Sequence, residues 1–144
     1  LTGYLDDPPP PPGPLATADV GYLAGGWLHV LGRADDVIVT GGENVHPAAV
    51  EAALLAAPGV AAACVFATPD DRWGQLVSAA IVPADGFDRA RALADAATRL
   101  PAHARPRRVV EVAELPLTAS GKVDRRRVAA LLGAAGPGGV TARA

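Results

Sequence analysis

The chain has 144 residues, of which half are hydrophobic and 19% are charged, with a formal net charge of −2 and a single cysteine. This length gives one ordinary domain a core but leaves no room for a large two-domain enzyme. Because general nucleic-acid binders and anionic-membrane binders need a net basic face, and because no apolar run reaches the ~20 residues of a membrane span, we expect neither nucleic acid nor a membrane as partner.

The N-terminal part predicts a proline-rich loop followed by a β-hairpin. Residues 8–14, PPPPPGP, can form only an extended polyproline segment, which is more typical of a linker or loop than of an SH3-type ligand. Residues 19–40 form a β-rich piece, in which Gly25-Gly26 suits a hairpin turn. The chain starts at Leu1 in mid-pattern, so we expect a fragment, and the lack of a signal-peptide pattern indicates a cytoplasmic protein.

A helix and two strands are expected in the middle of the chain. Pro47 suits a first helical turn, and Pro58-Gly59 ends the helix. Its apolar stripe consists of Val50, Ala53, Leu54 and Ala57. The runs 61–67 and 75–83 indicate two buried strands joined by a polar turn, residues 68–74. Cys64 lies within the first run, where it suits a small buried hydrophobe.

Two helices and one strand are expected in the C-terminal part. Residues 87–100 predict a surface helix ended by Pro101, residues 107–115 a third strand, and Asp124 can cap a last helix through Leu132. The stripe expected on the surface helix is Phe87, Ala90, Arg91, Ala94 and Ala97. Residues 133–144 should be disordered. This order predicts an α+β domain, a small mixed sheet with packed helices, preceded by a β-hairpin segment.

Lys122 is the first candidate for chemistry. It is the only lysine among 13 basic residues, and it follows Gly121 on a turn ahead of the last helix. A phosphate-binding P-loop would need Gly and Ser or Thr where the chain has Pro116 and Val123, so that interpretation fails. An ammonium can sit between two small anions, whereas a planar guanidinium demands a wider fork. Two interpretations of Lys122 remain: a functional lysine, or a solvated surface residue with no function.

Gly41-Gly42 permits either a plain hairpin end or a loop that approaches a ligand closely. Asp35 and Asp36 are adjacent in a β-type context, where they would point to opposite faces, so we expect no metal site there. The histidines show no zinc-ligand spacing, and the serines show no nucleophile frame. The remaining arginine clusters suit solvated faces balanced by Asp124 and Glu111 better than an anion site; they are residues 105, 107, 108 and 125–127.

Five stretches in this order resemble the C-terminal part of the adenylate-forming acyl/aryl-CoA synthetases, the AMP-binding enzyme superfamily. They are TADVGYL, GRADDVIVTGGENVHPAAVEAAL, PGV, PDDRWGQLVSAAIVP and LPLTASGKVDRR. The GGENVHP variant is most similar to o-succinylbenzoate-CoA ligases and to medium-chain or aryl acid-CoA ligases, with the former slightly favoured. The chain departs from the usual pattern at Ala18, where glycine is common, and at His103-Ala104, where a Tyr-Lys pair is common.

The resemblance implies a reaction in two steps, in which a carboxylate attacks ATP to give an acyl-adenylate and the thiol of coenzyme A then displaces AMP. Lys122 would be the catalytic lysine that bridges the carboxylate and the phosphate. Asp19 would accept from the ribose hydroxyls of ATP, and Arg33 would lie near the same nucleotide. Asp35 would be the hinge about which the small domain rotates, and Gly41 and Gly42 would line the pantetheine tunnel. Mg²⁺ would arrive with the ATP, bound mainly by the N-terminal domain.

The resemblance also implies a division of the chain. Residues 1–34 would end the large N-terminal AMP-binding domain, 35–132 would form the lid domain, and 133–144 would be the tail. The partners would be that large domain and a small carboxylic acid, and the resemblance allows a homodimer through the large domain. The fragment alone should be inactive. A carrier-loading adenylation domain and a non-catalytic stand-alone lid or interaction module are the alternatives.

Overall fold

The computed structural model describes residues 17–133. The proline-rich segment 8–14 and residues 134–144 of the predicted tail lie outside this range. Gly133, expected to begin the tail, is instead the last residue of a helix. The elements in chain order are strands β1 (Asp19–Ala24), β2 (Trp27–Arg33), β3 (Ile38–Thr40) and β4 (Glu43–Val45), helix α1 (Pro47–Leu55), strands β5 (Val60–Asp70) and β6 (Gly74–Pro83), helix α2 (Arg89–Arg99), strand β7 (Arg108–Glu111) and helix α3 (Arg125–Gly133).

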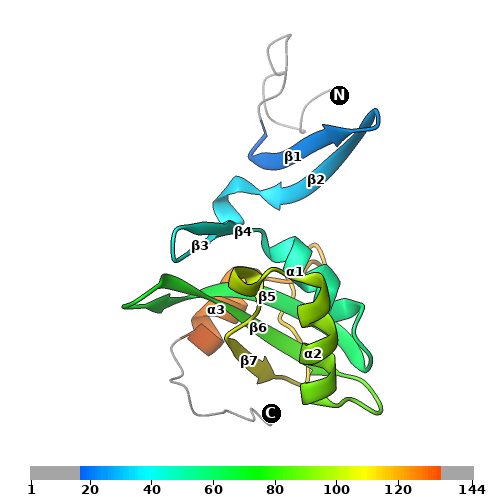
Figure 1. The fold of residues 1–144 in the computed structure, drawn as a ribbon. Coiled ribbons are helices and arrows are strands. Elements are labelled where there is room, and N and C mark those ends of the chain that lie inside the picture. Colours follow the sequence, from blue (N-terminus) through cyan, green and yellow to red (C-terminus); the bar gives the residue numbers. More distant parts are fainter. Residues whose placement is uncertain (1–16, 134–144) are drawn as a thin grey trace.

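The described part is a small mixed α+β domain preceded by a β-hairpin, as predicted (Figure 1). Strand β6 is the centre of the sheet, because it pairs antiparallel with β5 and β3 and parallel with β7. Antiparallel β4 extends the sheet beyond β3. The parallel pair is possible because α2 makes the crossover between β6 and β7.

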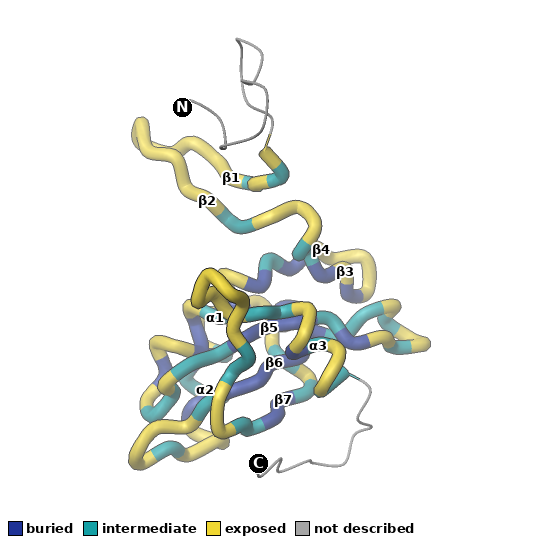
Figure 2. The backbone as a smooth tube through the Cα atoms, turned by 180° about the vertical axis from the view of Figure 1, so that it is seen from behind, coloured by how far each residue is buried: buried dark blue, intermediate teal, exposed yellow. Residues whose placement is uncertain are grey.

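Side chains alternate along the central strands and give the sheet two apolar faces. Val65, Val77 and Ile81 pack with α1 and α2, whereas Cys64, Phe66 and Ala80 pack with α3 on the other face. This alternation is the period of two expected of a strand. The sheet is therefore covered on both faces, and its strands carry the most buried residues of the domain (Figures 1 and 2).

The stripe predicted for α1 is confirmed, since Val50, Ala53, Leu54 and Ala57 are all buried. The stripe predicted for α2 is right only for Phe87 and Ala97, which are half-buried. Ala90, Arg91 and Ala94 are exposed, and the buried face is formed by Ala92, Ala96 and the following Leu100, with Leu93 partly buried. Alanines occupy both faces of this helix, so their spacing did not identify the buried one. The helix begins at Arg89 because the side chain of Asp88 accepts a hydrogen bond from the backbone N–H of Arg91.

The β1–β2 hairpin protrudes from the domain and is mostly exposed (Figure 2). Gly25 and Gly26 have φ angles of 59° and 82°, which a type I′ turn requires. Its large apolar side chains include Leu23 and Trp27, which are 77% and 76% exposed. None of the three helices within residues 17–133 has the length and apolar character that crossing a membrane would require.

Candidate functional site

Lys122 lies on an exposed turn that is held by its own backbone. The N–H of Thr118 donates to the carbonyl of Lys122 at 2.7 Å, and the N–H of Lys122 donates to the hydroxyl of Thr118 at 3.2 Å. Gly121 has a φ of 79°, which glycine adopts without the steric cost paid by other residues. Leu117 and Val123 bridge the two sides of the turn. Among residues 17–133, no ion pair engages Lys122, so its ammonium is presented to solvent on a defined base.

Two predicted nucleotide-site residues are brought together by the first hairpin. Asp19 and Arg33 are partners in the β1–β2 ladder, although they are far apart in the sequence, and both are exposed. Arg33 donates to the carboxylate of Asp35 at 3.3 Å, so the candidate hinge residue joins this group. Asp35 and Asp36 belong to a 3-10 turn, Ala34–Asp36, and not to a strand as expected.

Gly41 and Gly42 form the turn between β3 and β4, with φ angles of 59° and 85°. A type I′ turn needs a positive φ at both positions, so the turn itself explains both glycines. A Cβ at Gly41 would lie 2.6 Å from the indole ring of Trp73, whereas a Cβ at Gly42 would meet nothing within 4 Å. The guanidinium carbons of Arg107 and Arg72 lie 4.4 Å and 5.2 Å from the centroid of that ring. The glycine turn is therefore bordered by an aromatic ring and two cations.

Arg125 lies at the centre of a charged cluster that the sequence did not reveal. Its guanidinium donates to Asp36 at 2.7 Å, to Glu51 at 2.8 Å and to the carbonyl of Val65 at 2.8 Å. Glu51 also accepts from the N–H of Val65. Burial lowers the pKa of Arg125, but the hydrogen bond and charge of Glu51 and the charge of Asp36 outweigh it, so the pKa is raised. The expectation of a merely solvated face is wrong for Arg125.

Cys64 and Ser78 are packed inside the domain, away from solvent. Burial, with the charge of Glu51, raises the pKa of the Cys64 thiol to about 11. The hydroxyl of Ser78 lies 2.8 Å from that of Thr68, and both residues are buried. Within residues 17–133, no group of three or more His, Cys, Asp or Glu side chains is arranged to hold a metal ion.

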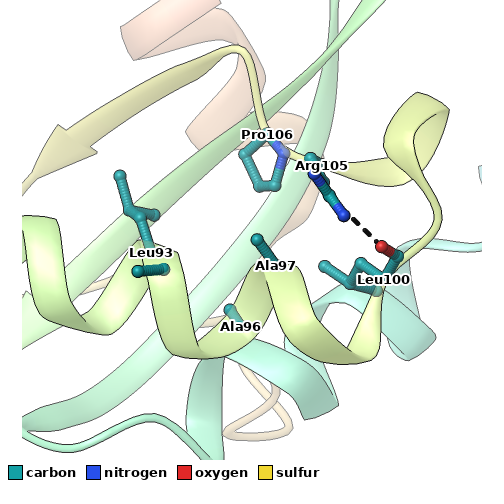
Figure 3. A pocket seen from close by; sticks show the side chains of 7 residues that line it. Leu93, Ala96, Ala97, Leu100, Arg105 and Pro106 are labelled. Carbon is teal, nitrogen blue, oxygen red and sulfur yellow. Dashed lines mark hydrogen bonds between the residues drawn. The ribbon is translucent and has the colours of Figure 1, made fainter.

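A pocket of about 300 Å³ lies between α2 and the segment that follows it (Figure 3). Leu93, Ala97, Leu100 and Pro106 contribute apolar walls, and Arg105 donates to the carbonyl of Leu100 at 3.2 Å. None of the predicted site residues lines it. The candidate site is therefore a set of exposed turns: the Lys122 turn, the Gly41 turn and the Asp19–Arg33–Asp35 group.

Comparison with known proteins gives one consistent result. The family described as AMP-binding enzyme C-terminal domain matches residues 49–122. The 4-chlorobenzoate–CoA ligase of Pseudomonas sp. (strain CBS-3) is 48% identical over 106 residues, which are 72% of this chain and 20% of the ligase. The 2-succinylbenzoate–CoA ligase of Listeria monocytogenes serotype 4b (strain F2365) is 39% identical over 113 residues, 78% of this chain and 24% of the ligase.

A solved structure agrees with these relatives in fold. The o-succinylbenzoate CoA synthetase of Bacillus subtilis, in complex with its acyl-adenylate intermediate, aligns with a TM-score of 0.74 at 36% identity. The alignment covers 79% of this chain and 24% of that structure. The chain thus spans about a fifth to a quarter of the length of the relatives it matches.

Proposed function

Because this chain belongs to the AMP-binding enzyme C-terminal domain family, we propose that it is the mobile lid of an ATP-dependent acid–CoA ligase. The reaction would proceed in two steps. A carboxylate attacks the α-phosphate of ATP, forming an acyl-adenylate and releasing pyrophosphate. The thiol of coenzyme A then attacks the acyl carbon, forming the thioester and releasing AMP. The lid would take part in both steps by rotating about Asp35.

The observation that carries this proposal is the presentation of Lys122. Two anions, a carboxylate and a phosphate, must approach one another in the first step, and an ammonium between them lowers their repulsion and stabilises the developing charge. The Lys122 turn is exposed, yet it is braced by the two hydrogen bonds with Thr118. Such a turn can deliver one cation into a neighbouring domain without losing its shape.

The other residues would serve the nucleotide and the thiol. Asp19 and Arg33, partners across one ladder, would offer a carboxylate to the ribose hydroxyls of ATP and a cation near the same nucleotide. The ring of Trp73 crowds the Cβ direction of Gly41, so the proposed contact with the pantetheine arm depends chiefly on Gly42, whose Cβ direction is open. Mg²⁺ would come with ATP and would be bound mainly by the N-terminal domain.

The boundary between the large domain and the lid is proposed at 34/35, and the lid is proposed to extend through Gly133, the last residue of α3. The acid is proposed to be o-succinylbenzoate or a benzoate-type aryl acid, because ligases for both occur among the relatives. A pyrophosphate-release screen of the complete enzyme against o-succinylbenzoate, 4-chlorobenzoate and medium-chain acids would choose between them. Thioester formation with coenzyme A, or with a carrier protein, would identify the acceptor.

The role of Lys122 can be tested in the complete enzyme with Lys122→Ala. We expect pyrophosphate release to fall by about 10²–10³-fold, the usual loss when one transition-state charge contact is removed. Thioester formation from supplied acyl-adenylate should change little, because the bridging cation is needed only in the first step. Arg126→Ala, which removes an exposed cation four positions along, is the matched control and should affect neither step. Equal losses in both steps for Lys122→Ala would refute the role.

A further inference from the structure

Arg125 joins the C-terminal helix to three other parts of the domain. Nη1 donates to Asp36 in the turn after β2, Nη2 to Glu51 in α1, and Nε to the carbonyl of Val65 in β5, all within 2.8 Å. Every nitrogen of the guanidinium therefore has its own acceptor. A lysine could not make these contacts together, because its donors radiate from one atom.

The cluster is shielded from solvent but not sealed. The side chains of Arg125, Asp36 and Glu51 are 29%, 35% and 18% exposed. Salt screens partly buried pairs much less than exposed ones, so this arrangement can keep its geometry at physiological ionic strength. The raised pKa of Arg125 agrees with a guanidinium whose charge is satisfied on two sides.

Asp35 and Asp36 are neighbours in the chain but are attached to different parts of the molecule. Asp35 pairs with Arg33 at the end of β2, whereas Asp36 pairs with Arg125 at the start of α3. The first pair is exposed on both sides, at 55% and 64%, and the second is about half as exposed. The side chain of Asp35 is thus paired within the hairpin segment, and that of Asp36 is paired within the lid.

Hydrogen bonds also connect the Lys122 turn to the start of α3, where Arg125 lies. The N–H of Asp124 donates to the carbonyl of Pro116, which closes the Lys122 turn, and Asp124 then caps α3 by accepting from the N–H of Arg127. Arg125 is the first residue of that helix. Whatever holds Arg125 therefore also holds the base of the Lys122 turn.

We propose that Arg125 is a positioning residue that locks the Lys122 turn to Asp36, immediately after the hinge, so that rotation at the hinge carries Lys122 to the reacting groups in one fixed orientation. This inference rests on the proposed function, in which Lys122 bridges the carboxylate and the phosphate. The contacts with Glu51 and Val65 hold Arg125 against α1 and β5 of the lid. The contact with Asp36 joins the residue after the hinge to the same arginine.

The test measures the two half-reactions of the complete enzyme, each at a temperature where every variant is folded. Arg125→Lys keeps the charge but loses the three-way fork, and Asp36→Asn keeps the shape but loses the charge. We expect each to slow adenylate formation by about 10–100-fold, since a misplacement of about 1 Å costs ~10²-fold in rate. KM for ATP and thioester formation from supplied acyl-adenylate should be nearly unchanged. Arg126→Lys, an exposed neighbour, should behave like the wild type.

A second experiment separates this inference from the proposed function. If Arg125 acts only through Lys122, Arg125→Lys should cause no further loss of adenylate formation in a Lys122→Ala background. A full additional loss there, or equal losses in both half-reactions of Arg125→Lys, would overturn the positioning role while leaving that of Lys122 intact. If Lys122→Ala itself left adenylate formation unchanged, the proposed function would fail first.

Discussion

The two glycines of the β3–β4 turn provide a matched pair for a stability test. Both have positive φ, so replacing either by alanine should cost about 1–2 kcal/mol for the left-handed backbone. Only at Gly41 does the new methyl group meet a neighbour, 2.6 Å from the ring of Trp73. Overpacking of this kind costs about 1–3 kcal/mol, and the half-buried ring can shift in part. Gly41→Ala should therefore lower the free energy of unfolding by ~2–4 kcal/mol. Gly42→Ala should lower it only by about 1–2 kcal/mol, which is what the left-handed backbone costs.

Urea unfolding followed by far-UV circular dichroism would measure both variants. Introducing Trp73→Ala removes the obstacle, so in that background Gly41→Ala should cost no more than Gly42→Ala. The coupling between Gly41→Ala and Trp73→Ala should then be of the order of 0.5–3 kcal/mol, as for other contacting residues. If Gly41→Ala cost the same with and without the indole ring, the steric explanation of Gly41 would be wrong.

Two further predictions concern buried groups of the sheet. The pKa of Cys64 is raised from 9.0 to about 11, so between these pH values the unfolded chain loses a proton that the native state keeps. The free energy of unfolding should therefore fall as the pH rises from 9 to 11. Urea titrations of Cys64→Ala should no longer show that fall. A slope unchanged by Cys64→Ala would contradict this assignment. Ser78→Ala leaves the hydroxyl of Thr68 buried without its partner and should cost about 1–3 kcal/mol, whereas adding Thr68→Val should recover part of that loss. Strictly additive losses in the double variant would show that the two hydroxyls do not interact.

Elements bounded by strong local signals were predictable from the sequence. Gly25-Gly26 marked a hairpin turn, and Pro47 and Pro58 bounded a helix whose buried stripe was predicted correctly, although apolar side chains such as Leu55 also lie on its exposed side. The two apolar runs 61–67 and 75–83 became β5 and β6, which are longer than expected. The reason is local, since the carboxylate of Asp70 accepts from two backbone N–H groups and tightens the connection. Strand β7 is shorter than expected, since only four of the nine predicted residues, Arg108–Glu111, pair with β6.

The charged cluster was not predictable by the same means. Arg125 stands in a run of three arginines, and nothing in that run distinguishes it from its neighbours. Its partners are 60 to 89 residues away, so only the folded chain brings them together. Asp36 was assigned to a strand, where it would have pointed away from Asp35, but the 3-10 turn instead directs it to α3. Local spacing in the sequence identified the turn that carries Lys122, but it did not identify the contacts of Arg125 that hold this turn to the rest of the domain.

The sequence separation within this cluster has a consequence for biosynthesis. Because Arg125 is joined to Asp36 across 89 positions, the ribosome completes the hairpins, α1 and the β5–β6 pair long before it supplies the guanidinium. Until then Asp36 and Glu51 are two like charges that lack the guanidinium they share in the folded domain. The nascent lid should therefore lack stable tertiary packing until its last helix is synthesised. A chain terminated before residue 125 should fold poorly and be cleaved more readily by proteases than the complete chain.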